Sequence, residues 1–248
     1  MRLSSYLLSF ILCILMFTAC DSGDILDENH AISSSGKTIK LTAYIKGVGI
    51  WESSGYNVAL AGFSDNSKYA VIQRAIPSAT LEKEETVMIL SNVSSNINHV
   101  ELAITNSLRK RIITLASLNM VDYENYGPVD TIYMNLGAID VDLFGCMQNG
   151  IFNKACISCH GGNGRSAGNL NLVAGNAYSN LVDVASTQKE GYIRVTSGEP
   201  ENSLLRMILN NGGENLLHYN HTEVLSSQFK TNLEEVRQLI DDWIVSLK

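Results

Sequence analysis

The sequence has few prolines and few aromatic residues, and it lacks any long basic run. Only 3 of its 248 residues are Pro and 7% are aromatic, whereas 45% are hydrophobic, which excludes a disordered or collagen-like chain. Lys and Arg number 18 against 25 Asp and Glu, a formal charge of −7. No basic stretch is interleaved with aromatic residues, so we expect no nucleic-acid partner. A chain of this length buries its own core, which leaves its 5 cysteines available for chemistry.

The N-terminus carries an apolar stretch at residues 6–17 that is too short to remain as a membrane-spanning helix. Its length suits the core of an export signal. It ends in Thr18-Ala19-Cys20, and small residues before a cysteine resemble the cleavage box of a bacterial lipoprotein. We therefore expect a lipoprotein signal peptide over residues 1–19 and Cys20 as the lipidated first residue of the mature chain; an ordinary secretory signal is the alternative.

Residues 20–36 are acidic at their start, Ser-rich at their end and without apolar periodicity, which predicts a solvated tether. The acidic start resembles the signal that directs some lipoproteins of Gram-negative bacteria to the outer-membrane surface; a plain soluble linker is the alternative. We expect a protein of the cell envelope, attached to the outer membrane by its lipid, in either the periplasmic or the surface leaflet.

Residues 37–136 show a period of two, the pattern of half-buried strands. Turn-forming clusters separate seven such runs, at the spacing of an antiparallel β-sandwich domain of the Ig-like or fibronectin-like kind. The runs are 39–46, 56–63, 69–76, 86–90, 99–104, 109–115 and 130–135. No metal, nucleophile or phosphate signature lies inside them. Such a domain could bind a glycan or another envelope protein, although a fold alone does not name a ligand.

The period changes to that of a helix after about residue 140. Apolar residues recur at three and four residue intervals from Val141 to Ala155, and the helix runs into Cys-Ile-Ser-Cys-His at residues 156–160. Gly161 and Gly162 then end it.

Cys-x-x-Cys-His is the attachment site of c-type haem. Cys156 and Cys159, one helical turn apart, add to the two vinyl groups of the porphyrin, and His160 becomes the proximal iron ligand. Two rival interpretations are a thioredoxin-type redox pair, which needs a βαβ context, and half of a zinc site, which needs a second cysteine pair. The sequence shows neither. It predicts one covalent haem c.

The Cys-Ile-Ser-Cys-His sequence at residues 156–160 is called the haem box here, and several further segments accompany it. They are 168–172, Gly-Asn-Leu-Asn-Leu; 197–204, Ser-Gly-Glu-Pro-Glu-Asn-Ser-Leu; and a terminal helix with Val236, Ile240 and Trp243. Together they resemble the small mono-haem class I cytochrome c domains of exported bacterial proteins, over about residues 140–248. The resemblance implies an all-α domain in which Phe152 contacts Ile240 and Trp243. The expected fold is thus two-domain: an all-β sandwich followed by an all-α class I cytochrome c domain.

The resemblance also bears on the other haem contacts. The family usually supplies a Met as the distal ligand, ahead of the last helix. Here no Met occurs there, and counting back from Leu225-Ser226, which match the Leu-Ser before that helix, puts His218 at its position. His221, Met207 and an open iron are the alternatives.

Other polar residues complete the expected site. Arg165, Tyr192 and Arg194 are candidates to hold the haem propionates by charge-assisted hydrogen bonds. Cys146 remains without a partner and is expected to be a buried free thiol.

These features predict a lipid-anchored c-type cytochrome that carries out one-electron transfer at the cell envelope, with an unidentified redox partner protein. No triad, paired carboxylates or substrate motif indicates an enzyme. Two alternatives remain: an envelope binding module whose haem is accessory, and a haem enzyme or gas sensor with an open sixth position.

The lipid anchor can be tested directly. Two acyl chains hold a protein stably on a membrane, at about 0.8 kcal/mol per buried methylene. We expect Cys20→Ser to release a soluble form that still carries its haem, measured by fractionation and palmitate labelling. Unlabelled wild-type protein in the soluble fraction would show that the leader is an ordinary secretory signal.

Overall fold

The computed structural model describes residues 36–51, 54–78, 84–127, 130–162, 166–210 and 216–247. The expected signal peptide, Cys20, almost all of the tether and Arg165 lie outside these residues. The chain from Ser34 to Lys248 forms one compact unit.

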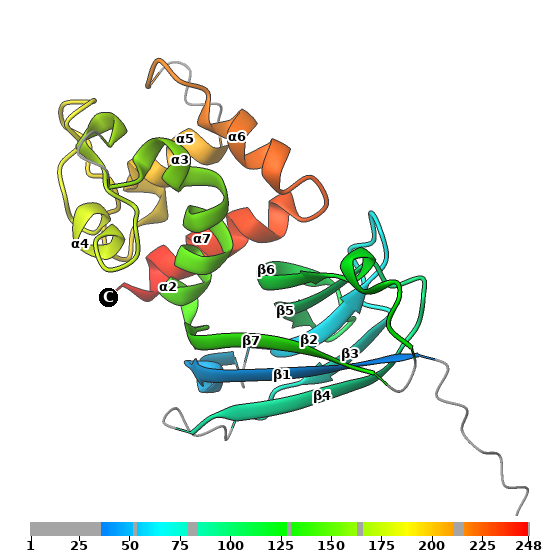
Figure 1. Ribbon diagram of the computed structural model, residues 1–248. Coiled ribbons are helices and arrows are strands. Elements are labelled where there is room, and N and C mark those ends of the chain that lie inside the picture. The colour runs from blue at the N-terminus through cyan, green and yellow to red at the C-terminus, as the bar shows by residue number, and fades with distance from the viewer. Residues whose placement is uncertain are drawn as a thin grey trace, which may run out of the picture. The chain divides into compact units, whose positions relative to one another are not determined.

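Seven strands form at the seven expected places and make two sheets that pack on each other (Figure 1). Sheet A contains, in spatial order, β4 (Thr86–Val93), β1 (Lys37–Lys46) and β7 (Thr131–Asp140). Sheet B contains β3 (Ile72–Ala75), β2 (Tyr56–Phe63), β5 (His99–Asn106) and β6 (Arg111–Asn119). Neighbouring strands are antiparallel except β1 and β7, which run parallel. The expectation of a purely antiparallel sandwich was therefore wrong, because β1 and β7 run parallel.

The core between the sheets follows from the alternation of apolar residues along the strands. In β1, Ile39, Leu41 and Ile45 are fully buried, while Lys40 and Tyr44 between them face outward. Leu60 of β2 and Leu102 of β5 meet them from sheet B, and both are fully buried.

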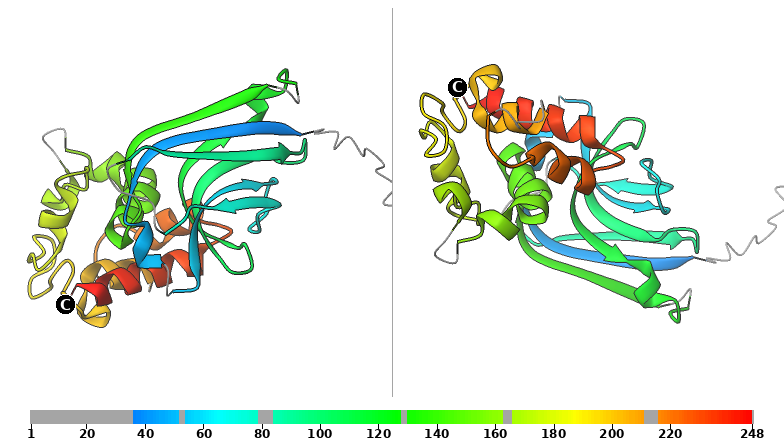
Figure 2. Two further views of the ribbon diagram at one scale, coloured as in Figure 1. Left: turned by 90° about the horizontal axis from the view of Figure 1, so that it is seen from below. Right: turned by 90° about the horizontal axis from the view of Figure 1, so that it is seen from above.

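The helices that follow β7 gather at one end of the sheets (Figure 2). Two 3-10 turns lie between strands, η1 (Val48–Trp51) and η2 (Met120–Tyr123). After β7 come α2 (Leu143–Cys146), η3 (Met147–Cys156), α3 (Ile157–His160), η4 (Ala167–Asn169), α4 (Ala177–Leu181), η5 (Pro200–Asn202), α5 (Leu204–Asn210), α6 (His221–Gln228) and α7 (Leu233–Ser246). The first three run on without a break and are called the box helix here; its middle section, η3, is a π-helix.

The box helix packs directly on strand β6. Gly150 comes so close that a Cβ there would lie 2.3 Å from Ile113 Cγ1. The carbonyl oxygens along the outer edge of β6 are also occupied from the helical side. Asn232 Nδ2 donates to Ile112 O over 2.7 Å, and Lys154 Nζ donates to Thr114 O. Apolar residues of the strands and of the helices belong to one continuous core.

The expected fold, an all-β sandwich followed by a separate all-α class I cytochrome c domain, is therefore wrong. The helices share the core of the sheets and form no separate helical domain. Much of the chain between the box helix and α5 is irregular, held by isolated bridges such as Val182 with Val195. No three described His, Cys, Asp or Glu side chains form a group that could hold a metal ion. The resemblance to the class I family is not sustained by this architecture.

One expected helix contact does form. The rings of Phe152 and Trp243 lie 6.5 Å apart at 82°, and Phe144 lies 5.6 Å from Trp243. On α7 the residues that face this contact, including Val236 and Ile240, are buried. Within the part of the chain that the structure describes, no helix has the length and apolar character to cross a membrane.

The close contact of Gly150 with Ile113 predicts that the sheets and the helices unfold together. Gly150→Ala forces a methyl group against Ile113 and should cost about 1–3 kcal/mol of unfolding free energy. Denaturant unfolding should show one transition at a lower midpoint, by far-UV circular dichroism and by tryptophan fluorescence alike. Gly49→Ala is the control, because a Cβ at Gly49 meets nothing within 4 Å. Two separate transitions would contradict a shared core.

Candidate functional site

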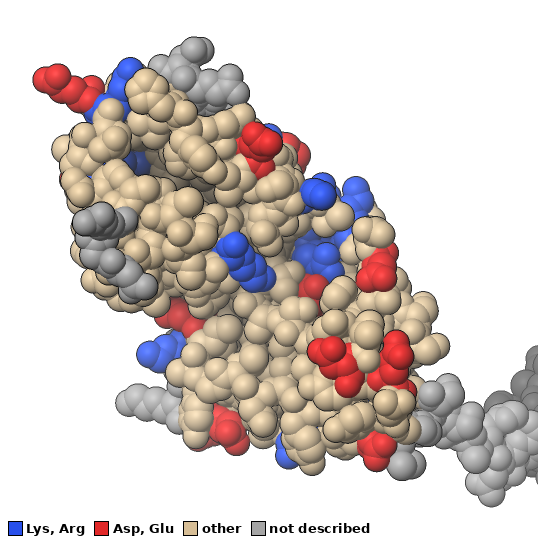
Figure 3. Space-filling view, turned by 45° about the horizontal axis from the view of Figure 1, so that its top comes forward, with Lys and Arg blue, Asp and Glu red and all other residues tan. Residues whose placement is uncertain are grey.

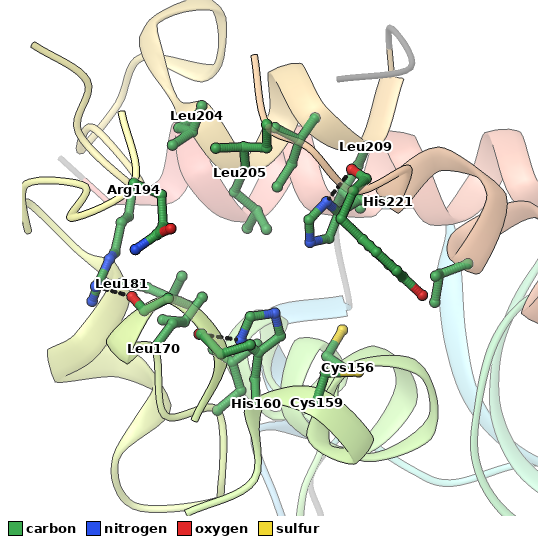
Figure 4. Close-up of a pocket in the computed structure, with 18 of the residues that line it drawn as sticks. Cys156, Cys159, His160, Leu170, Leu181, Arg194, Leu204, Leu205, Leu209 and His221 are labelled. Atoms are coloured by element: carbon green, nitrogen blue, oxygen red, sulfur yellow. Dashed lines mark hydrogen bonds between the residues drawn. The ribbon is translucent and has the colours of Figure 1, made fainter. Parts of the chain in front are cut away.

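A cavity of about 690 Å³ lies among the helices, walled by the box helix, the loops at 167–194, α5 and α6. This volume is within the range of small-molecule and cofactor sites. Most of its wall is apolar, with Leu side chains from several segments: Leu170, Leu172, Leu181, Leu204, Leu205, Leu209, Leu216, Leu217 and Leu225. Figure 4 shows how the labelled side chains surround it.

The box helix brings the Cys-x-x-Cys-His residues to the cavity wall. Asp142 caps its start by accepting a hydrogen bond from Gly145 N over 2.7 Å. Gly161 ends it in extended backbone, where a Cβ would lie 2.4 Å from Ile157 O. Cys156, Cys159 and His160 all line the cavity, Cys156 half-buried and Cys159 exposed. The structure thus brings together the three residues of the predicted haem box.

The His160 ring is oriented by the backbone. Its Nδ1 lies 2.9 Å from Ala167 O, so that nitrogen carries the hydrogen and Nε2 keeps its lone pair. Burial lowers the pKa of His160, which favours the neutral imidazole that ligates metals. A backbone carbonyl that accepts from the other ring nitrogen usually holds a ligating His in its orientation.

His221 is arranged in the same way on the other side of the cavity. It is the first residue of α6, and its Nδ1 lies 3.0 Å from Tyr219 O. The centroids of the His160 and His221 rings are 6.3 Å apart, with 22° between their planes. Figure 4 shows the two rings facing each other beside the Cys156 and Cys159 sulfur atoms.

The other candidate distal ligands are placed differently. His218 reaches the cavity wall but is exposed to solvent. Met207, on α5, does not line the cavity, whereas its neighbours Leu205 and Ile208 do.

The His160 and His221 rings are spaced like two imidazoles that bind one metal ion. Two imidazoles on opposite sides of one metal ion have centroids about 6.4 Å apart, given about 2.0 Å from metal to nitrogen and about 1.2 Å from nitrogen to centroid. The 6.3 Å between His160 and His221 matches this value. The side chains in place therefore fit a flat, apolar metallocofactor held between two imidazoles.

One end of the cavity is cationic. Lys189 and Arg194 line it together with Ser186 and Gln188, and no described Asp or Glu takes part in the wall. This end suits the carboxylates of a cofactor. Sequence reasoning missed Lys189. The antiparallel bridge between Ala185 and Ile193 closes the loop that carries Lys189, and no local sequence pattern indicates that pairing.

Arg194 is almost fully buried, at 7% exposure, and its guanidinium is engaged by backbone carbonyls. Nη1 donates to Asn180 O over 2.8 Å, and Nη2 donates to Gly168 O and Asn169 O, each over 3.2 Å. It therefore braces the η4 turn that presents Ala167 O to His160. Of the other expected propionate contacts, Tyr192 is not part of the cavity wall and Arg165 lies outside the described residues.

The cysteines lack the features of a redox dithiol. Burial and, to a smaller extent, the neighbouring Cys159 thiol raise the pKa of the Cys156 thiol to about 12. Dithiol oxidoreductases instead depend on a cysteine of lowered pKa. Cys146 is a buried free thiol whose Sγ lies 3.4 Å from Val141 O, and burial raises its pKa as well.

No family model, no curated protein and no solved structure matches the chain.

The bracing role of Arg194 can be tested by Arg194→Lys, which keeps the charge but loses the planar set of donors. Carbonyls left without donors should lower the unfolding free energy by about 1–3 kcal/mol in denaturant titrations. Arg74→Lys is the control, since exposed Arg74 makes one bond of 3.0 Å, to Ile89 O. Its cost should stay within about 0.5 kcal/mol. Equal midpoints for both variants would show that Arg194 does not brace the turn.

Proposed function

We propose that the protein binds one c-type haem through Cys156 and Cys159, with His160 and His221 as axial ligands, and carries single electrons at the cell envelope. The observation that carries the proposal is the pair of imidazoles 6.3 Å apart beside the two haem-box sulfur atoms. When bound, the haem supplies a metal that accepts and releases one electron. The porphyrin would itself hold the iron, so the chain would add only His160 and His221 as ligands, and no cluster of three side chains would be needed.

The residues of the chain account for the other requirements of an electron carrier. The carbonyls of Ala167 and Tyr219 hold both rings in place, so the ligands need not reorient when the charge changes. The Leu-rich wall gives the cavity an apolar lining. Lys189 provides a cation at the wall for a propionate, while Arg194 is bound to backbone carbonyls and holds the η4 turn.

This arrangement favours electron transfer over the alternative of a gas sensor or haem enzyme. Those functions require an open axial position for a diatomic ligand or substrate. His221 already occupies the side of the cavity opposite His160. Attachment to the envelope through a lipid on Cys20 belongs to the same proposal and rests on the N-terminal sequence alone.

Covalent attachment gives the first test. Expressed with a haem-attachment machinery, the protein should show a haem-stained band that survives boiling in denaturant, and Cys156→Ser with Cys159→Ser should abolish it. Cys146→Ser is the matched control, because this buried thiol lies outside the cavity wall, and it should keep the band. A colourless wild-type protein from the same cells would refute the proposal.

The axial ligand is tested in the same preparation. His221→Ala should convert a low-spin ferric spectrum to a high-spin one and allow carbon monoxide to bind the reduced protein. His218→Ala and Met207→Leu should leave the spectrum unchanged. If His218→Ala produced the change and His221→Ala did not, the distal ligand would be His218.

A further inference from the structure

Positive charge is concentrated where sheet B meets the helices. Figure 3 shows Lys and Arg side chains gathered along this junction, next to the hollow in the helical part. Six of the 18 Lys and Arg residues belong to it, and they are called the basic seam: Lys68, Arg109, Lys110, Arg111, Lys154 and Lys230.

Hydrogen bonds hold these residues together although they come from distant segments. Arg111 N donates to Lys68 O over 2.7 Å, and Ala70 N donates to Arg109 O over 2.9 Å. From the helical side, Lys154 Nζ donates to Thr114 O.

Lys230 joins the seam through the turn between α6 and α7. It lies two residues before Asn232, whose amide donates to Ile112 O.

The seam keeps a surplus of positive charge. Glu101 is buried and binds Arg111, with Oε2 2.9 Å from Nε and Oε1 2.9 Å from Nη2. Glu235 pairs with Lys110. No described carboxylate forms an ion pair with the other four cations, so six positive charges meet two negative ones. The surplus stands out because the whole chain has a formal charge of −7.

The seam adjoins the site at the edge where the sulfur atoms lie. Lys154 precedes Ala155 and Cys156, which both line the cavity, and Ser158 and Cys159 are exposed at its wall. A molecule bound on the seam therefore comes close to the attachment edge of the cofactor.

We propose that the basic seam is the docking surface for an acidic redox partner protein, which receives an electron from the site. The inference rests on the proposed function and names the chemistry of its partner. A folded partner is favoured over an anionic lipid surface because several cations are held at fixed positions. Arg109 Nη1 donates to Val71 O and Lys154 Nζ donates to Thr114 O, so two of the cations that form no ion pair among the described residues are held in place. Cations at fixed positions can pair with carboxylates that are themselves at fixed positions on a folded surface.

The reaction with a small anionic oxidant tests whether the basic seam or the net charge of the chain controls the rate at which the protein gives up an electron. Hexacyanoferrate(III) takes one electron and becomes hexacyanoferrate(II), while the protein loses one electron and no bond or proton is exchanged. If the net charge of the chain dominated, this anion would be repelled and its rate would rise with salt. If the basic seam dominates, the rate falls with salt, measured by stopped flow on the purified haem-loaded protein. A rate that rises with salt overturns the proposal.

Matched variants locate the effect. Replacing Lys68, Arg109 and Lys230 by Gln removes three charges from the seam; replacing Lys40, Lys46 and Arg74 by Gln removes three from other strands. The seam variant should react with hexacyanoferrate(III) about tenfold more slowly at low salt. The control should change less than twofold. Equal effects would overturn the proposal.

Binding without electron transfer separates protein from lipid. Poly-L-glutamate, a probe for an acidic protein surface, should bind the wild type in titration calorimetry and lose binding in the seam variant. Vesicles of phosphatidylglycerol should not sediment the protein in its Cys20→Ser form, which lacks the lipid. Sedimentation that depends on the seam would show that lipid is the occupant. A protein without covalent haem would fail the proposed function itself, before any of these measurements.

Discussion

The packing of the box helix on β6 is the contact on which the rest of the structure depends. As the edge strand of sheet B, β6 has unpaired backbone groups that must find partners or stay open to another chain. Side chains from the helical part supply these partners at alternate carbonyls, Ile112 O and Thr114 O. The absence of a side chain at Gly150 allows the close approach. The same contact therefore protects the sheet edge and fixes the orientation of the haem box.

Local patterns were sufficient to predict much of this. The period of two located all seven strands, and the change of period located the box helix and α7. The patterns did not indicate that the helices and the sheets share one core. The approach of Gly150 to Ile113 and the bond from Asn232 to Ile112 join residues 37 or more positions apart. A pattern read within one segment cannot report such pairings, so two domains were expected where one unit forms.

The distal side of the site shows a second limit. His218 was preferred because Leu225 and Ser226 were taken to precede the last helix. They lie inside α6 instead, an additional helix that begins at His221. This helix start, with Asn220 as its cap, turns the His221 ring toward His160 and leaves His218 in solvent. The proximal side needed no such alignment, since the spacing of Cys156, Cys159 and His160 is set by the haem itself.

The parallel pairing of β1 with β7 has a consequence for the order of folding. Partners such as Ile39 and Ile132 are more than ninety residues apart, so sheet A closes only when β7 has reached β1. Closing so long a loop is slow compared with local turns. The box helix follows β7 directly, and Val141 N bonds to Lys46 O at the end of β1. If the protein carries the proposed covalent haem, the Cys156 and Cys159 thiols would stay accessible to an attachment enzyme until sheet A closes and the cavity forms around them.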